Sequence, residues 1–157
     1  MPDCIAQLID QVKTAASGRT PLRIAGGDSK HFMGRQPTGE MLSTSRHSGI
    51  VEYEPTELVI SARAGTTITE LNAALSENGQ RLGCEPPEIG GATIGGTLAC
   101  NQSGPARPWL GSIRDHVLGV RLVNGHGEHL RFGGRVMKNV AGYDVSRLQA
   151  GAMGTLG

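Results

Sequence analysis

Apolar residues follow a helical spacing near the start of the chain. They recur three or four positions apart, at Ile5, Leu8, Ile9, Val12 and Ala16. Asp3 stands where a helix cap belongs and Gly18 where a helix commonly ends, so the pattern predicts a helix between these two residues.

The segment "TTITELNAALSENG", residues 66–79, predicts a second helix. Its apolar stripe consists of Ile68, Leu71 and Leu75. Thr67 and Glu70 have the spacing of a capping box, and Gly79 is the expected C-terminal stop.

Short or alternating apolar runs predict strands elsewhere. The first half carries three of them, in "PLRIAGG" (21–27), "GIVEYEP" (49–55) and "ELVISARAG" (57–65), with Pro55 separating the last two. In "HVLGVRLVNGHGEHLRF" (116–132), apolar and polar residues alternate on both sides of "NGHG", which predicts a β-hairpin.

These elements indicate an α+β fold with two lobes. The first half mixes strands and helices, whereas the second reads mostly as strand and loop. "EPPE" cannot continue a helix, so we place the boundary near residues 82–87, with lobes at 1–85 and 86–157. The chain stops in the apolar, glycine-rich "GAMGTLG", and we expect it to be a fragment truncated in the second lobe; the alternative is a short chain with a frayed end.

Composition narrows the function classes. The net charge is +1 and aromatic residues make up 3%, which argues against binding nucleic acid or an anionic membrane. The three cysteines form no paired framework, as expected in a reducing compartment. Glycine is the exception: the 24 glycines among 157 residues are about twice the average share, and they fall in clusters.

The first cluster lies in "RIAGGDSKHF", where Gly26 and Gly27 directly follow a predicted strand. Glycines let backbone N–H groups converge on an anion, and Ser29 and Lys30 add a hydroxyl and a cation. The segment is neither a Walker loop nor a G-x-G-x-x-G fingerprint. Taken alone, an ordinary tight turn explains it as well as a phosphate cradle does.

Two further clusters strengthen the phosphate hypothesis. "TIGGTLACNQSG" (93–104) combines close backbone approach with the neutral polar groups of Thr97 and Asn101, and residues 151–157 form a third glycine-rich loop. Three separate clusters favour an elongated, phosphate-bearing ligand over three unrelated turns.

Four motifs in uninterrupted order carry a family resemblance. They are "PLRIAGGDSK", "EPPEIGGATIGGTLACNQSG", "GSIRDHVLGVRLVNGHG" and "KNVAGYDVSRLQAGAMGTLG". Together they resemble the FAD-binding domain of the vanillyl-alcohol oxidase type, also called the p-cresol methylhydroxylase type, and within it the FAD-binding subunits of bacterial glycolate oxidases. The resemblance runs from Pro21 to Gly157 and implies two α+β lobes with FAD between them.

The resemblance implies cofactor-binding roles by position. The first pyrophosphate loop matches Gly26, Gly27, Asp28, Ser29 and Lys30. The segment leading to the flavin matches Pro86, Pro87 and Glu88. The second loop, against the pyrophosphate and the flavin edge, matches Gly95, Gly96, Ala99, Asn101, Gln102 and Gly104. The loop near the adenosine matches Gly151, Gly154 and Thr155.

Three departures from the family pattern qualify these roles. Asp28 stands where many relatives have a third glycine, so its carboxylate is expected to turn away from the pyrophosphate or to bind backbone N–H groups. Relatives with covalent flavin often have a histidine in this loop, whereas His31 lies three positions beyond Asp28, so we expect non-covalent FAD. "GAMG" replaces the more common Gly-Ser-Glu-Gly, which implies one missing polar contact.

The family implies oxidation of a 2-hydroxy acid, with FAD accepting a hydride equivalent. It also implies a hetero-oligomer with a second flavin subunit and an iron–sulfur subunit, in the cytoplasm or at the inner membrane through those partners. Two alternatives stay open: an electron-relay or structural subunit that binds FAD without turning over substrate, and a non-catalytic module for phosphate ligands.

The remaining polar groups carry weaker signals. The set Lys138, Asn139, Tyr143 and Asp144 either contacts the flavin or substrate or, as the favoured interpretation, fixes a loop. Arg114 and Asp115 are expected to form a local ion pair. His126 and His129 flank the hairpin turn, and a metal site there lacks further ligands. No catalytic base is assigned.

Overall fold

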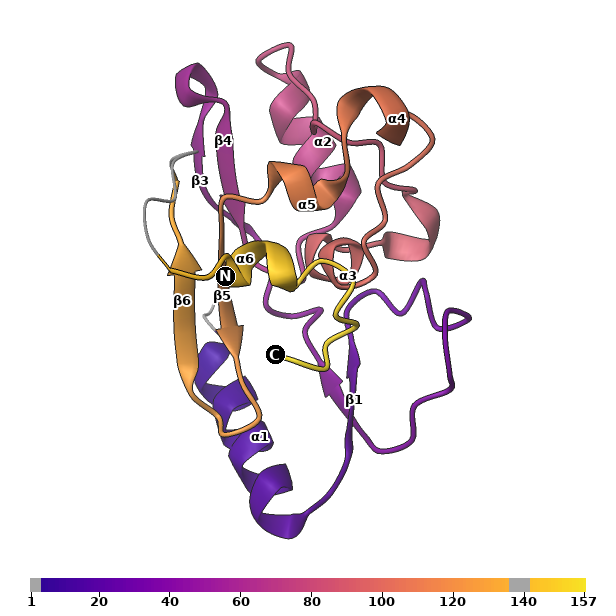
Figure 1. Ribbon diagram of the computed structural model, residues 1–157, viewed down its shortest axis with the longest axis vertical. Helices are drawn as coiled ribbons and strands as arrows, with labels where there is room; N and C mark the ends of the chain where they lie inside the picture. Colours follow the sequence, from indigo (N-terminus) through magenta and orange to yellow (C-terminus); the bar gives the residue numbers. More distant parts are fainter. Residues whose placement is uncertain (1–3, 136–141) are drawn as a thin grey trace.

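The computed structural model describes residues 4–135 and 142–157. Within these ranges the helices are α1 (Ile5–Gly18), α2 (Ile68–Ser76), α3 (Ile94–Ala99), α4 (Arg107–Leu110), α5 (Ile113–His116) and α6 (Val145–Leu148). The strands are β1 (Leu22–Ala25), β2 (Glu40–Ser43), β3 (Ile50–Glu54), β4 (Val59–Ala62), β5 (Gly119–Val123) and β6 (His129–Gly133). Figure 1 shows their arrangement.

The two predicted amphipathic helices are confirmed. α1 ends at Gly18 and buries Val12 and Ala15, while the expected cap Asp3 lies outside the described residues. α2 has the predicted capping box between Thr67 and Glu70. It ends at Ser76, and the chain turns over the next three residues to Gly79, which has a φ of +64°.

The strands form three separate pairs. β3 and β4 make the hairpin that Pro55 interrupts, joined by the short 3-10 turn Pro55–Glu57, and β5 and β6 make the predicted hairpin around "NGHG". The third pair is parallel: β1 lies beside β2, with Ala25 opposite Ser43. The sequence pattern did not indicate β2, because Met41 and Leu42 are its only apolar residues.

The second half contains more helix than the sequence pattern indicates. α3 occupies the stretch expected as a glycine-rich loop. α4 and α5 precede the β5–β6 hairpin in the chain, and α6 follows it. α3 forms because Thr93 caps it, its hydroxyl accepting a hydrogen bond from the N–H of Gly96 at 3.2 Å. Ile94 N–H also donates to the carbonyl of Thr66 at 2.9 Å, which ties the helix start to the turn before α2.

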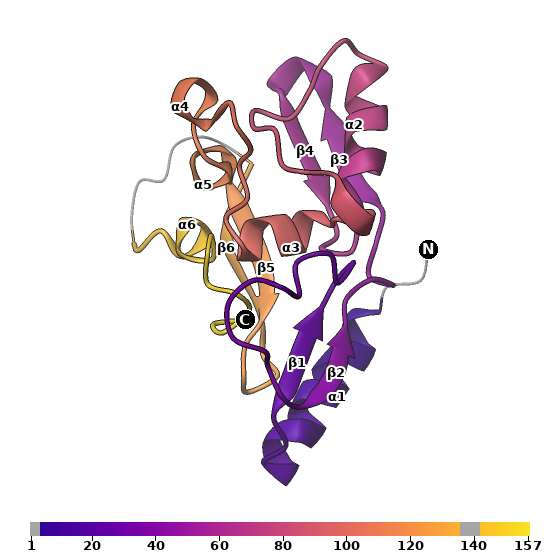
Figure 2. The ribbon, with the colours of Figure 1, turned by 90° about the vertical axis from the view of Figure 1, so that its right-hand side faces the viewer.

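The apolar core contains residues from both sides of the predicted lobe boundary. Ile68 and Leu71 of α2 pack with Ala92, just before α3, and these three side chains are at most 2% exposed. Figure 2 shows α3 between the β1–β2 pair and the β3–β4 hairpin with α2. α3 therefore occupies the centre of the molecule. The division into lobes 1–85 and 86–157 stays a prediction.

Candidate functional site

The three glycine clusters meet around α3. At its start, the backbone of Gly26 lies so close to Thr93 that a Cβ on Gly26 would be 2.5 Å from the threonine hydroxyl. At its end, the N–H of Gly151 donates to the carbonyl of Leu98 at 3.0 Å and that of Met153 to the carbonyl of Ala99 at 2.9 Å. The structure thus brings together three loops, the first and third of which are more than a hundred positions apart in the sequence.

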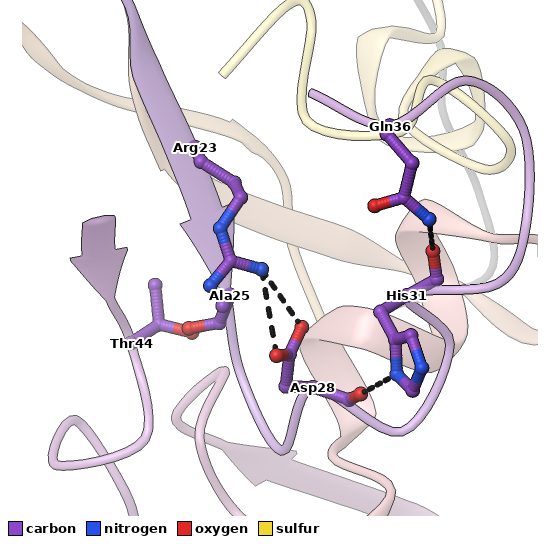
Figure 3. Close-up of polar contacts among 6 residues, drawn as sticks. All are labelled: Arg23, Ala25, Asp28, His31, Gln36 and Thr44. Atoms are coloured by element: carbon purple, nitrogen blue, oxygen red, sulfur yellow. Dashed lines mark hydrogen bonds and ion pairs between the residues drawn. The ribbon is translucent and has the colours of Figure 1, made fainter. Parts of the chain in front are cut away.

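The first loop begins where β1 ends (Figure 3). The N–H of Thr44, just after β2, donates to the carbonyl of Ala25 at 2.8 Å and fixes the chain before the loop. The carbonyl of Asp28 lies 3.0 Å from Nδ1 of His31, and the carbonyl of His31 accepts a hydrogen bond from the Gln36 side chain at 3.0 Å. Backbone and side-chain contacts within the segment therefore hold the loop's shape.

The Asp28 carboxylate is paired with Arg23, a residue of β1. Its two oxygens lie 3.2 and 3.4 Å from Nη1 of Arg23 (Figure 3). Asp28 also has a φ of +50°, a left-handed conformation that aspartate adopts more readily than most residues. The charge of Asp28 is thus compensated within the chain.

Each of the three loops contains a non-glycine residue in this left-handed region: Asp28 in the first, Asn101 in the second and Met153 in the third. Such backbone is costly and often accompanies functional sites. The side-chain oxygen of Asn101 is also buried, with no hydrogen-bond partner among the described residues.

Several glycines predicted to face a ligand are needed for contacts within the chain. A Cβ on Gly27 would lie 2.0 Å from the carbonyl oxygen of Gly91, and one on Gly95 would lie 2.7 Å from the Cβ of Ala64. A Cβ on Gly104 would lie 1.7 Å from the carbonyl oxygen of Glu85. No real Cβ tolerates these distances, so the fold alone requires glycine at these positions.

Other glycines have open surroundings. A Cβ on Gly91 would meet no atom of the described chain within 4 Å, and Gly90 has only Ser29 nearby, at 3.4 Å. Both have positive φ, at +58° for Gly90 and +73° for Gly91. On Gly96 a Cβ would contact only the Thr93 hydroxyl, at 3.3 Å. Gly90 and Gly91 are not among the residues to which the family resemblance gives a role, although their position between "EPPE" and the Thr93 cap was an available signal.

The segment leading to α3 is held by α2. Pro86 is buried, Pro87 is partly buried, and the Glu88 carboxylate accepts hydrogen bonds from the Thr69 hydroxyl at 2.9 Å and the Asn72 side chain at 2.6 Å. The acceptor groups of Glu88 are therefore used within the chain.

The first loop and the residues that follow it interact with residues just after α3. The Lys30 ammonium lies 3.4 Å from the Ser29 hydroxyl. Burial raises the pKa of the Cys100 thiol, and the Lys30 charge offsets only part of that effect. The Gln102 side chain reaches the sulfur of Met33 at 3.4 Å. The Lys30 charge therefore acts electrostatically on Cys100 of the second loop.

In the third loop, Gly151 and Gly154 both have positive φ. A Cβ on Gly151 would lie 3.5 Å from Asn101, and one on Gly154 would lie 3.1 Å from the Ile24 side chain. The Thr155 hydroxyl donates to the carbonyl of Ala152 at 2.7 Å. This loop therefore packs between the end of α3 and β1.

Polar residues away from α3 have structural roles. The Asp144 carboxylate caps α6 by accepting from the Arg147 N–H at 3.0 Å, and Tyr143 is 96% exposed. Lys138 and Asn139 lie outside the described residues. The Asn124 side chain closes the hairpin turn by accepting from the N–H groups of His126 and Glu128, both at 3.0 Å. No group of three histidines, cysteines or acids capable of holding a metal occurs in the described ranges.

The expected ion pair between Arg114 and Asp115 is replaced by a cap. Asp115 accepts hydrogen bonds from the N–H and the hydroxyl of Ser112, both at 2.8 Å, and so begins α5. These hydrogen bonds lower the pKa of Asp115, and Arg114 adds only a minor contribution. Helix capping therefore determines the position of this carboxylate.

Both capping boxes make the stability of the fold depend on pH in the acidic range. The N–H and hydroxyl of Thr67 lower the pKa of Glu70 as those of Ser112 lower that of Asp115. A carboxyl group with a lowered pKa in the folded chain adds stability that is present above its unfolded pKa of about 4 and is lost as the pH falls through the folded pKa.

In thermal unfolding between about pH 5 and pH 2, the Glu70→Gln/Asp115→Asn double variant should lose less stability on acidification than the parent. Parallel losses would contradict this expectation.

Comparison with known proteins adds information at the level of the family. A family model described as FAD binding domain matches residues 1–133. The chain is 58% identical over 151 residues to the glycolate oxidase subunit GlcE of Escherichia coli (strain K12), covering 96% of this chain and 43% of that protein. It is 32% identical over 149 residues to a D-lactate dehydrogenase of Archaeoglobus fulgidus, covering 92% of this chain and 33% of that protein. The chain thus spans less than half the length of these curated relatives.

Among solved structures, an alkyldihydroxyacetonephosphate synthase matches with a TM-score of 0.79 at 24% identity, over 99% of this chain and 29% of its own. This likeness concerns the fold alone. In the described ranges, no helix combines the length and the apolar composition that crossing a membrane requires.

Proposed function

The chain belongs to the FAD-binding domain family, and from that membership we propose that it holds the FAD of an oxidoreductase acting on a small 2-hydroxy acid such as glycolate. The family match and the structural likeness confirm the predicted α+β fold, and the family match confirms FAD as the cofactor. The observation that carries the proposal is the convergence of three glycine loops on α3, beside a glycine pair with open surroundings.

The residues around α3 suit a pyrophosphate. Gly90, Gly91 and Gly96 leave room for a ligand against the backbone, and Ser29 and Lys30 add a hydroxyl and a cation. The Asp28 carboxylate, which would repel a phosphate, is neutralised by Arg23. We assign these residues to the pyrophosphate and the third loop, with Gly151 and Gly154, to the adenosine arm.

We further propose that FAD is dissociable. In the first loop the His31 ring lies with Nδ1 against the Asp28 carbonyl, so this nitrogen is held by the loop itself. Acid precipitation of the protein should release the flavin into the supernatant. Flavin fluorescence that stays with the denatured chain on a gel would contradict non-covalent binding.

The substrate class rests on relatives from two sources, one named for glycolate and one for D-lactate. Both are 2-hydroxy acids. Bound FAD supplies the redox chemistry by accepting a hydride equivalent. The chain's contribution is to bind and orient the cofactor on its glycine loops. No general base is assigned among its residues.

We also propose that the chain works within a complex. The Escherichia coli relative is named as a subunit, and a second flavin subunit and an iron–sulfur subunit are the partners that we expect, in the cytoplasm or at the inner membrane. The alternative role is an electron-relay subunit that binds FAD without oxidising substrate. An activity assay separates the two roles.

The experiment uses a chimera in which this chain replaces the aligned part of the Escherichia coli subunit, expressed in cells that lack that subunit. Glycolate-dependent dye reduction in membranes or extracts should return, and a chimera with Gly96→Val is the matched control. The isolated chain is titrated with FAD in parallel. FAD binding without restored activity would refute the substrate proposal, whereas no FAD binding by either protein would refute the cofactor role.

A further inference from the structure

Asp28 places a negative charge in a loop whose proposed ligand is an anion. Residues 22–30 carry two cations, Arg23 and Lys30, and this single acid. The Asp28 carboxylate pairs with Arg23 at 3.2 Å (Figure 3). Lys30 is then the cation of the loop that this carboxylate does not neutralise. The pair therefore sets the net charge that a pyrophosphate would meet.

We propose that Asp28 is an affinity-setting residue, which competes with the FAD pyrophosphate for Arg23 and so keeps cofactor binding weaker than the loop alone would allow. This inference rests on the proposed function. Arg23 is then a second phosphate-binding cation, which becomes available to the ligand when its pairing with the Asp28 carboxylate is broken.

The geometry suits exchange of one anion for another. The side chains of Arg23 and Asp28 are 25% and 48% exposed, so solvent and a ligand can reach both. An exposed ion pair of this kind contributes little to stability. Removing it should therefore change the charge of the loop without unfolding the chain.

The backbone at Asp28 allows a clean test of charge. At a φ of +50°, asparagine and glycine are both well tolerated, whereas alanine is strained. Asp28→Asn keeps the size of the side chain, and Asp28→Gly keeps the backbone conformation; both remove the carboxylate. Asp28→Ala controls for backbone strain.

We expect Asp28→Asn and Asp28→Gly to bind FAD about three- to tenfold more tightly at low salt, with a steeper loss of affinity as salt is added. Arg23→Gln leaves Asp28 uncompensated and should weaken binding by a similar factor. The double variant Arg23→Gln/Asp28→Asn has the parent's net charge and should return close to the parent's affinity.

The measurement is fluorescence titration at several salt concentrations, with riboflavin, which has no phosphate, as the control ligand. Thermal unfolding verifies that each variant is folded. If the ion pair had only a structural role, its effect would not depend on phosphate charge. FAD affinity would then fall in every variant, and the salt dependence of binding would stay unchanged.

Three results overturn the inference. If the parent chain binds FAD and Asp28→Asn and Asp28→Gly bind it equally or more weakly, the inference is refuted, while the proposed function stands. Equal tightening for riboflavin and FAD refutes the competition for phosphate. The titrations are repeated on the chimera, and no FAD binding by the parent chain or by the chimera refutes the proposed function, and the inference with it.

Discussion

Replacing Gly104 with alanine should prevent stable folding, although family resemblance places this residue in a cofactor loop. The new Cβ would lie 1.7 Å from the carbonyl oxygen of Glu85 and 2.5 Å from its carbon, both backbone atoms. The φ of +76° adds further strain for any residue with a side chain. The Glu85 N–H donates to the carbonyl of Ser103 at 3.1 Å, so the two segments cannot separate without losing that bond.

We expect a loss of at least about 3 kcal/mol, a large part of the stability of a domain of this size. The measurement is thermal or urea unfolding followed by circular dichroism. Gly125→Ala is the matched control, because a Cβ on Gly125 meets nothing within 4 Å. If Gly104→Ala melts like the parent and loses only FAD, the glycine serves the ligand and our structural explanation is wrong.

Replacing Gly96 with valine should instead abolish most FAD binding in a folded chain. A Cβ on Gly96 contacts only the Thr93 hydroxyl, at 3.3 Å, and valine is no worse than glycine inside a helix. The isopropyl group would occupy the space against the Gly96 backbone that we assign to the pyrophosphate. Loss of close backbone approach should raise the dissociation constant at least about 30-fold, or 2 kcal/mol.

The adjacent residue provides the contrast. Gly95→Val directs its side chain against Ala64, whose Cβ would be 2.7 Å from the new Cβ, so it should lower the melting temperature. FAD titration and thermal unfolding of both variants separate the two roles. Parent-like affinity in a folded Gly96→Val protein would remove Gly96 from the site.

The sequence by itself determined the elements whose stability is local. The α2 capping box joins residues three positions apart, and the β5–β6 hairpin is closed by a turn of adjacent residues. Such contacts require no distant partner, so their residue types and spacing are sufficient to predict them. The family motifs likewise identified the glycine clusters.

Only the tertiary structure decided what each glycine is for. Gly27 and Gly91 are indistinguishable in sequence, yet a Cβ on Gly27 would collide with the carbonyl of Gly91, whereas a Cβ on Gly91 would meet nothing within 4 Å. β2 exists because β1 supplies its hydrogen bonds, and the place of α3 in the fold depends on the Thr66 carbonyl, which accepts a hydrogen bond from the Ile94 N–H. The pairing of Asp28 with Arg23 also depends on where the loop turns after β1. Each of these features is a contact across the fold, and its energy depends on a neighbour that local sequence does not specify.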